Sequence, residues 1–328
     1  MVMVEARNLK KHFPVKRTII DAMLGKPQLF VKAVDGVSLD IEEGEVLGLV
    51  GESGSGKTTT GRLILRLIEP TEGSVKIDGK EIFTMSKEEL RRFRRNIQII
   101  FQDPMAALNP YMRIGEAVKH PLEIHGIGST EKERRRLVYE MLERVNLTPP
   151  DEFYRRYPKE LSGGQRQRVV IARALITKPR FVVADEAVAM LDVSIRSQLL
   201  KLLADLKNEY NLTMLFITHD LATTKYLCDR IAVMYLGKIV EIGSFRHIYE
   251  NPKHPYTRAL ISAVPEPDPK KKKKRFIPKG EVPNPINPPR GCRFHPRCEQ
   301  AMQICSKKEP KLIEVEPGHQ VSCFLYQE

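Results

Sequence analysis

The sequence predicts an α/β fold whose central strands are parallel. From Met1 to about Ser262, short apolar runs alternate with longer amphipathic stretches, which is the pattern of a sheet covered by helices. Three apolar runs, at residues 45–50, 181–184 and 213–217, are short and rich in β-branched residues, as buried parallel strands are. Because ligands of open α/β sheets bind beyond the carboxyl ends of the strands, these runs predict one shared site.

The composition is that of a globular protein and excludes a disordered chain. The chain has 328 residues, of which 41% are hydrophobic and 29% are charged, and this length allows two folding units. We find no uninterrupted run of 18 apolar residues and no signal-like leader at Met1, so we expect neither a membrane span nor secretion, and a cytoplasmic location. The net charge of +13 predicts an anionic partner such as nucleotide, nucleic acid or lipid headgroups.

The remaining elements follow in chain order. Residues 131–144 predict a surface helix in a helical insertion, with Leu137, Met141 and Leu142 on its apolar face. Residues 231–242 predict a hairpin around Gly237. We place one domain at residues 1–262, with a helical part at about 103–160, a Pro/Lys-rich linker at 263–290 and a cysteine-rich segment at 291–328. The basic run at 270–275 reads as solvated, or as a contact with anionic lipid.

A phosphate-binding loop follows the first of the three strands. Residues 51–58 read G-E-S-G-S-G-K-T and precede a helix-like run at 59–68, so the motif G-x-x-x-x-G-K-[ST] stands in its required context. The glycines let backbone N–H groups surround phosphate oxygens at a helix N-terminus. Lys57 is expected to reach the β- and γ-phosphates, and Thr58 to ligate Mg²⁺. The nucleotide-binding residues predicted here are Gly51, Ser53, Gly54, Ser55, Gly56, Lys57, Thr58 and Thr59.

The other two strands also end in residues suited to phosphate chemistry. Asp185 and Glu186 follow the strand at 181–184, and this pair predicts one carboxylate for the Mg²⁺ shell and one that polarises the attacking water. His219 follows the strand at 213–217 and is a candidate contact of the γ-phosphate and the water. The sequence therefore predicts hydrolysis of a nucleoside triphosphate.

The segment Leu161-Ser162-Gly163-Gly164-Gln165 decides the class of this predicted hydrolase. Together with the phosphate loop, the acidic pair and His219, it resembles the signature of ABC-type ATPases over residues 1 to about 250. The resemblance implies a P-loop ABC ATPase domain with a helical and an antiparallel β subdomain, two such domains pairing head to tail, and ATP between them. It also implies that Gln102 senses Mg²⁺ and the transmembrane partner, and that Phe13 stacks on adenine. Ser162, Gly163, Gly164 and Gln165 would bind the γ-phosphate across the dimer.

Finer motifs resemble the ATPase subunits of oligopeptide and dipeptide importers. They are residues 101–104 (FQDP), 108–110 (LNP) and the tail segment 291–298 (GCRFHPRC). Residues 61–63, 69–71 and 96–98 look closer to the second ATPase of such importers, the F subunit. The implied partners are a non-identical ATPase subunit, two transmembrane permease subunits and an extracytoplasmic substrate-binding protein, at the cytoplasmic face of the cell membrane.

Other functions stay open at this point. Relatives of this class also move nickel complexes or short oligosaccharides. A nucleic-acid-linked ABC ATPase would fit the positive charge and a metal-binding tail, although such proteins usually carry a long coiled coil or two cassettes, which this chain lacks. The family usually continues after Glu186 with Pro, Val, Ser, Ala, Leu and Asp, whereas Ala187 and Ala189 stand here in place of Pro and Ser. We therefore expect communication between the two ATP sites to differ from the family pattern, whereas Glu186 and His219 are retained.

The last 37 residues hold four cysteines, Cys292, Cys298, Cys305 and Cys323. The segment is too short and polar to build its own core, so a metal would supply folding energy. By ligand type, four thiolates suit Zn²⁺ and an iron–sulfur cluster equally, and free thiols or disulfides are the third possibility. Tails of this type in the importer family hold a [4Fe–4S] cluster, so the resemblance implies iron–sulfur. His295 and His319 read as surface residues, and Cys228 as a small buried hydrophobe.

Overall fold

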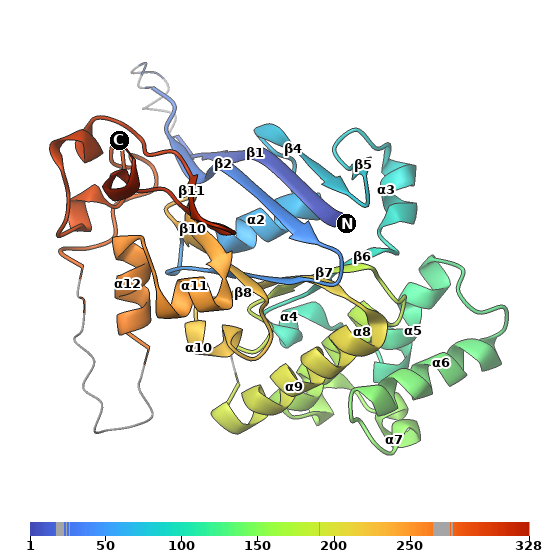
Figure 1. Ribbon diagram of the computed structural model, residues 1–328. Coiled ribbons are helices and arrows are strands. Elements are labelled where there is room, and N and C mark those ends of the chain that lie inside the picture. Colours follow the sequence, from blue (N-terminus) through green and yellow to red (C-terminus); the bar gives the residue numbers. More distant parts are fainter. Residues whose placement is uncertain are drawn as a thin grey trace, which may run out of the picture. The chain divides into compact units, whose positions relative to one another are not determined.

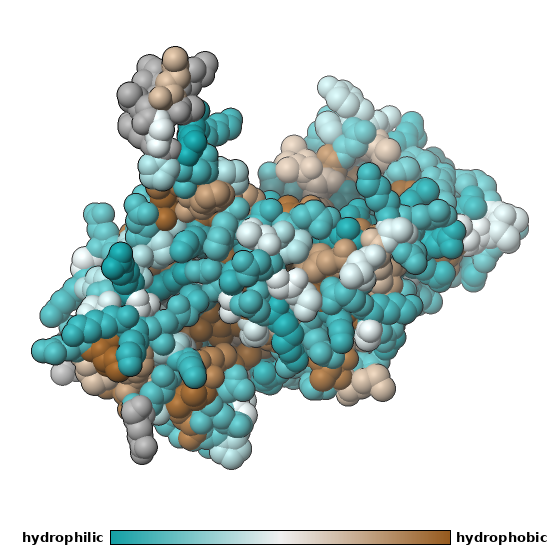
Figure 2. Space-filling model, turned by 90° about the horizontal axis from the view of Figure 1, so that it is seen from above, coloured by the Kyte–Doolittle hydropathy of each residue, from teal (hydrophilic) through white to brown (hydrophobic). Residues whose placement is uncertain are grey.

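The computed structural model describes residues 1–17, 23, 25, 27–189, 191–264, 276 and 278–327. The chain forms two compact units. The helical unit contains residues 1, 41–46 and 84–217, and the phosphate-loop unit contains residues 2–40, 47–83 and 218–328. Within the described residues, no helix is long and apolar enough to cross a membrane. Hydrophilic residues cover most of the face shown in Figure 2, with apolar side chains in smaller groups.

The helical unit is built on three parallel strands. These are β6 (Ile97–Ile100), β7 (Phe181–Asp185) and β8 (Thr213–Thr218). Strand β7 pairs in parallel with β6, where Phe181 faces Ile97, and with β8, where Phe181 faces Thr213. All residues of β7 and β8 are buried, which explains why both read as unbroken apolar runs.

The helices of this unit are α3 (Lys87–Phe93), α4 (Pro104–Ala107), α5 (Ile114–Ile124), α6 (Glu131–Arg144), α7 (Pro150–Arg155), α8 (Gly163–Leu175) and α9 (Val193–Tyr210). Helices α6 to α9 of this unit are drawn in green to yellow in Figure 1, and the earlier helices α3 to α5 are drawn in teal to green. The helix predicted at 131–144 is confirmed with the same bounds. Thr130 caps it by accepting a hydrogen bond from the Glu133 N–H at 3.1 Å. The predicted apolar face was wrong at one position, because Val138 is buried there while Leu137 is only half-buried.

The phosphate-loop unit contains an antiparallel sheet with the strand order β2-β1-β4-β5. Its members are β1 (Val2–Pro14), β2 (Phe30–Glu42), β4 (Glu72–Ile77) and β5 (Lys80–Glu81). A second group of strands consists of β3 (Val46–Val50), β9 (Arg230–Tyr235), β10 (Lys238–Ser244), β11 (Ile313–Glu316) and β12 (His319–Val321). Strand β9 pairs in parallel with β3 and antiparallel with β10, and β12 joins β10 to β11.

The predicted hairpin at 231–242 is confirmed as β9 and β10. Its turn residues Leu236 and Gly237 have φ of 43° and 81°, the left-handed pair that a two-residue hairpin turn requires. The helices of this unit are α2 (Lys57–Ile64), α10 (Leu221–Thr224), α11 (Phe245–Glu250) and α12 (Pro255–Ser262). The helix expected at 59–68 begins earlier, at Lys57, and ends at Ile64 because Arg66 adopts a left-handed φ of 48°.

The cysteine-rich segment is part of the phosphate-loop unit. Strand β12 adds to β10, where Val321 faces Glu241, and the red tail lies beside β10 in Figure 1. His319 was expected at the surface, but it is fully buried and its Nε2 lies 2.8 Å from Glu241 Oε1. Cys228 is buried as predicted. The basic run predicted at 270–275 lies outside the described residues.

Candidate nucleotide site

The phosphate loop joins β3 to α2 by a path that only glycine can follow at two positions. Gly51 and Gly56 have φ of 156° and 107°. A Cβ atom at Gly51 would lie 2.1 Å from the Met234 carbonyl oxygen, and one at Gly56 would lie 2.1 Å from the Ala33 carbonyl oxygen. Glycine is therefore required at both positions for two reasons: the backbone φ is positive, and a neighbouring carbonyl oxygen occupies the space of a Cβ atom.

Lys57 is folded back over the loop that it terminates. The side chain is buried, and its Nζ donates to the carbonyl oxygens of Gly51 at 2.9 Å and Glu52 at 3.1 Å. Ser55 is also buried, and its Oγ has no hydrogen-bond partner within the described chain, which is unusual for a buried hydroxyl. The loop therefore presents an ammonium group and an unsatisfied hydroxyl at the start of a helix, as an anion site does.

The other residues predicted around the nucleotide in this unit are more exposed. Ser53, Gly54 and His219 are exposed, and Thr58 and Thr59 are half-buried at the start of α2. Phe13 is the penultimate residue of β1 and has 37% of its surface exposed, and the Lys11 Nζ lies 5.1 Å from its ring centroid. An exposed aromatic ring at a strand end is available for stacking.

In the helical unit, two residues predicted from separate motifs lie together. Gln102 follows β6 and Glu186 follows β7, and the Gln102 Nε2 donates to Glu186 Oε2 at 2.8 Å. Asp185 is buried at the end of β7. Glu186 adopts a left-handed φ of 47°, a conformation that costs roughly 1–2 kcal/mol for a residue with a Cβ. Such costs are typical of functional sites.

The signature segment forms a capped helix start in the same unit. The Ser162 Oγ accepts from the Gln165 N–H at 3.2 Å, and Gln165 Oε1 accepts from the Ser162 N–H at 2.9 Å. This capping box begins the 13-residue helix α8. Gly164 is buried, and a Cβ there would lie 2.7 Å from Ile195 Cγ2. The preceding Gly163 is half-buried, so the helix start is closely packed on one side.

The four tail cysteines lie near one another but do not form a metal-binding geometry. All are free thiols. Burial, followed by the mutual influence of the other cysteines, raises the pKa of Cys292 to about 12 and that of Cys323 to about 11. Across the described residues, no group of three or more His, Cys, Asp or Glu side chains could hold a metal ion. Burial raises the pKa of Cys298 as well, so the neutral thiol is favoured at Cys292, Cys298 and Cys323.

Comparisons with known proteins assign the family. Residues 34–189 match the family model for ABC transporters, and residues 240–305 match that for the oligopeptide/dipeptide transporter C-terminal region. A peptide import ATP-binding protein of Brucella ovis is 51% identical over 98% of this chain and 97% of its own length. The chain belongs to the ABC transporter family. It is an ATPase of the oligopeptide/dipeptide transporter group, as its motifs predicted.

Further ABC relatives support the same group and fold. The oligopeptide transport ATP-binding protein OppF of Escherichia coli K12 is 48% identical over 98% of this chain and 96% of its own length. A dimeric bacterial ABC transporter cassette of known structure has a TM-score of 0.64 and 32% identity, over 74% of this chain and 99% of its own. The predicted P-loop ABC ATPase fold is therefore confirmed.

Sequence reasoning missed residues that support the phosphate loop from a distance. The Arg297 guanidinium contacts the Glu52 carboxylate, and the Tyr256 hydroxyl accepts from the Glu52 N–H at 2.9 Å. Arg297 lies within the segment that was read only for its cysteines. No local pattern predicts this contact, because Arg297 and Glu52 are 245 residues apart.

Proposed function

We propose that this chain hydrolyses ATP to power the import of di- and oligopeptides, bound at the cytoplasmic face of the cell membrane. The observation that carries this proposal is the similarity, along nearly the whole chain, to a protein named for oligopeptide transport. We propose as partners two transmembrane permease subunits, an extracytoplasmic substrate-binding protein and a second, non-identical ATPase subunit. The absence of a membrane-spanning helix in the described residues agrees with peripheral attachment.

The phosphate-loop unit would bind the triphosphate. Lys57 would exchange its two carbonyl acceptors for the β- and γ-phosphate oxygens, because a charged acceptor makes the stronger hydrogen bond. The Ser55 hydroxyl, buried without a partner among the described residues, would gain an acceptor in the same step. Phe13 would stack on the adenine, and His219 would contact the γ-phosphate.

The helical unit would supply the hydrolytic carboxylates. Gln102 and Asp185 of this unit are proposed as Mg²⁺ ligands, as is Thr58 of the phosphate-loop unit, and the ion would neutralise phosphate charge. Glu186 would orient and polarise the attacking water, and its hydrogen bond with Gln102 would report the state of the transmembrane partner. In the head-to-tail dimer, Ser162, Gly163, Gly164 and Gln165 of one subunit would contact the nucleotide on the other.

The test is uptake by vesicles that contain the chain with its permease subunits and binding protein. We expect ATP-dependent entry of labelled di- and tetrapeptides, and no entry of maltotriose or a nickel chelate. Glu186→Gln should abolish turnover while sparing ATP binding, and Lys57→Ala should weaken binding itself. Uptake of the sugar or nickel instead of peptides would reassign the substrate, and near-normal hydrolysis by Glu186→Gln would remove its assigned role.

We also propose that the four tail cysteines hold a [4Fe–4S] cluster, with zinc as the alternative. Their chemistry fits, because they supply four free thiols in one small segment and influence one another's pKa. Binding would require deprotonation of the thiols and their closer approach. Anaerobic purification followed by iron, sulfide and zinc determination tests this: about four irons and four sulfides per chain support the cluster, and about one zinc supports the alternative.

A further inference from the structure

The cysteine-rich segment contacts the phosphate loop through Arg297. The Arg297 Nη1 lies 3.0 Å from Glu52 Oε2, and its Nη2 lies 3.4 Å from Oε1. Only 9% of the Arg297 side chain and 30% of the Glu52 side chain are exposed. A two-point, shielded contact fixes the orientation of the carboxylate more firmly than a surface ion pair does.

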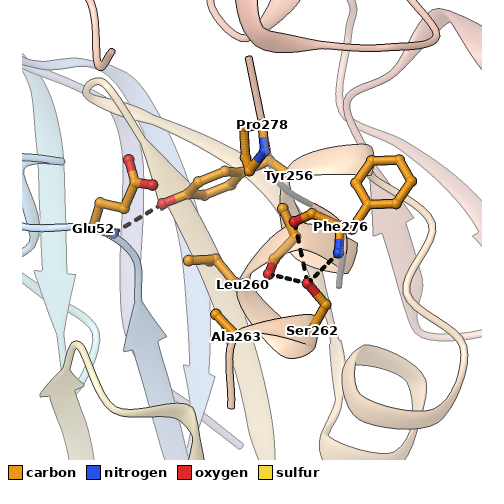
Figure 3. A pocket seen from close by; sticks show the side chains of 8 residues that line it. Glu52, Tyr256, Leu260, Ser262, Ala263, Phe276 and Pro278 are labelled. Atoms are coloured by element: carbon orange, nitrogen blue, oxygen red, sulfur yellow. Dashed lines mark hydrogen bonds between the residues drawn. The ribbon is translucent and has the colours of Figure 1, made fainter. Parts of the chain in front are cut away.

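Glu52 is held on its backbone as well. The Glu52 N–H donates to the Tyr256 hydroxyl at 2.9 Å, as Figure 3 shows. Tyr256 is fully buried and packs on Tyr235 and Phe294, with ring centroids 4.6 and 5.4 Å away. Arg297 lies over the same two rings. The arginine and the tyrosine that hold Glu52 therefore belong to one aromatic cluster.

Glu52 is in turn a partner of Lys57, the lysine proposed to bind nucleotide. The Lys57 Nζ donates to the Glu52 carbonyl oxygen at 3.1 Å. Movement of residue 52 would therefore move an acceptor of Lys57 directly. The contacts run from the residue before Cys298, through Glu52, to the ammonium group that is expected to meet the phosphates.

A second arginine of the segment contacts the other side of the site. Arg293, which follows Cys292, pairs with Asp35 and donates to the Leu236 carbonyl oxygen. Asp35 also lies 3.0 Å from the His12 Nε2, and His12 precedes Phe13. Burial alone would raise the pKa of Asp35, but Arg293 and His12 together lower it. Each arginine stands next to a cysteine. Arg297 contacts Glu52 within the phosphate loop, and Arg293 contacts Asp35, whose other partner His12 precedes Phe13.

We propose that Arg297 is a positioning residue through which the cysteine-rich segment sets the conformation of the phosphate loop. The inference rests on the proposed nucleotide site. By reciprocity of linked equilibria, a segment that favours the binding conformation is itself stabilised when nucleotide binds. Arg293 supports the adenine side in the same way.

The test uses the full-length chain and two readouts. Equilibrium binding of MgATP is measured for wild type, Arg297→Gln, Arg297→Lys and Glu52→Gln, and hydrogen exchange is measured over residues 291–300 with and without MgATP. Arg290→Gln is the matched control, because Arg290 is exposed and lies directly before the cysteine-rich segment. We expect Arg297→Gln to raise the Kd about 3- to 10-fold, the range of modest coupling, and to raise KM more than it lowers kcat. Arg297→Lys should be intermediate.

The exchange measurement separates positioning from a general loss of structure. MgATP should slow exchange over 291–300 in wild type and in Arg290→Gln, but not in Arg297→Gln. The double variant with Glu52→Gln should bind no more weakly than the worse single variant, since both remove one contact. Unchanged affinity in Arg297→Gln, or full protection by MgATP in that variant, overturns the inference. Failure of wild type to bind MgATP would instead overturn the proposed function.

Discussion

The buried carboxylate of Glu241 is expected to be a main support of the C-terminal part of the phosphate-loop unit. It is fully buried on β10 and accepts from the N–H groups of Lys253 at 2.6 Å and His254 at 2.9 Å. Its third partner is the fully buried His319 of β12, whose Nε2 lies 2.8 Å away. Glu241→Ala would remove all three contacts at once.

The size of the effect follows from the groups that lose a partner. A buried donor left without an acceptor costs about 1–3 kcal/mol, so three donors give about 3–9 kcal/mol, the lower figure if water enters the space. Glu241→Gln keeps a carbonyl oxygen and should lose only about 1–2 kcal/mol. Glu281→Ala removes an exposed carboxylate and should change the stability by less than about 0.5 kcal/mol.

Two measurements check this prediction. Urea unfolding followed by circular dichroism gives the stability, and hydrogen exchange reports the amides of Lys253 and His254 directly. Both amides should exchange faster in Glu241→Ala, and α12, which begins at Pro255, should lose protection with them. A stability loss below about 1 kcal/mol, or unchanged protection of the two amides, would refute the reasoning.

Three further changes have defined outcomes. Burial lowers the pKa of His254 to about 4, so the unfolded chain binds the extra proton as the pH falls below about 6.5. The stability that comes from the neutral ring is therefore complete above about pH 6.5 and is lost towards pH 4. His254→Asn keeps an N-cap acceptor but has no ring to titrate, so its free energy of unfolding should depend less on pH between these two values than that of the wild type. Gly56→Ala should prevent the loop from forming, because its Cβ meets the Ala33 carbonyl oxygen, whereas Gly54→Ala, with nothing within 4 Å, should cost about 1 kcal/mol in the same denaturation assay. Lys119→Met should lower the stability by about 1 kcal/mol, because Lys119 contacts Glu116, Glu123 and Glu131. The difference in stability between wild type and this variant should shrink at high salt, and an equal difference at low and high salt would contradict the ionic role.

Local patterns predicted much of the fold. The strands β3, β7 and β8 carry their own signal, because a buried parallel strand has no polar face. Helix α6 was predicted at both ends by its charge pattern, but the choice of Leu137 over Val138 was wrong, because neighbouring residues on a helix point about 100° apart. The end of α2 was missed since the left-handed turn at Arg66 uses no glycine.

Burial that depends on distant partners could not be predicted in this way. His319 was assigned to the surface, yet it is buried against Glu241, 78 residues earlier in the chain. The contact between Arg297 and Glu52 could not be predicted from the sequence for the same reason, because the two residues are 245 positions apart. The hydrogen bonds of His319 with Glu241 and of Arg297 with Glu52 form only when the C-terminal segment packs on the rest of the phosphate-loop unit. The residues next to each of these side chains in the sequence do not indicate that packing.

The contacts around Glu186 explain how its costly conformation is kept despite the unusual residues that follow. The Glu186 N–H donates to the Ile217 carbonyl oxygen at 3.0 Å, and the Ala189 N–H donates to the Glu186 carbonyl oxygen at 3.0 Å. With the Gln102 contact to its carboxylate, three hydrogen bonds offset the cost of the left-handed backbone. The contact made by Ala189 uses only its backbone. The absence of a serine hydroxyl at this position therefore leaves these hydrogen bonds of Glu186 unchanged, and we expect any effect of Ala189 to arise away from the carboxylate proposed to polarise the attacking water.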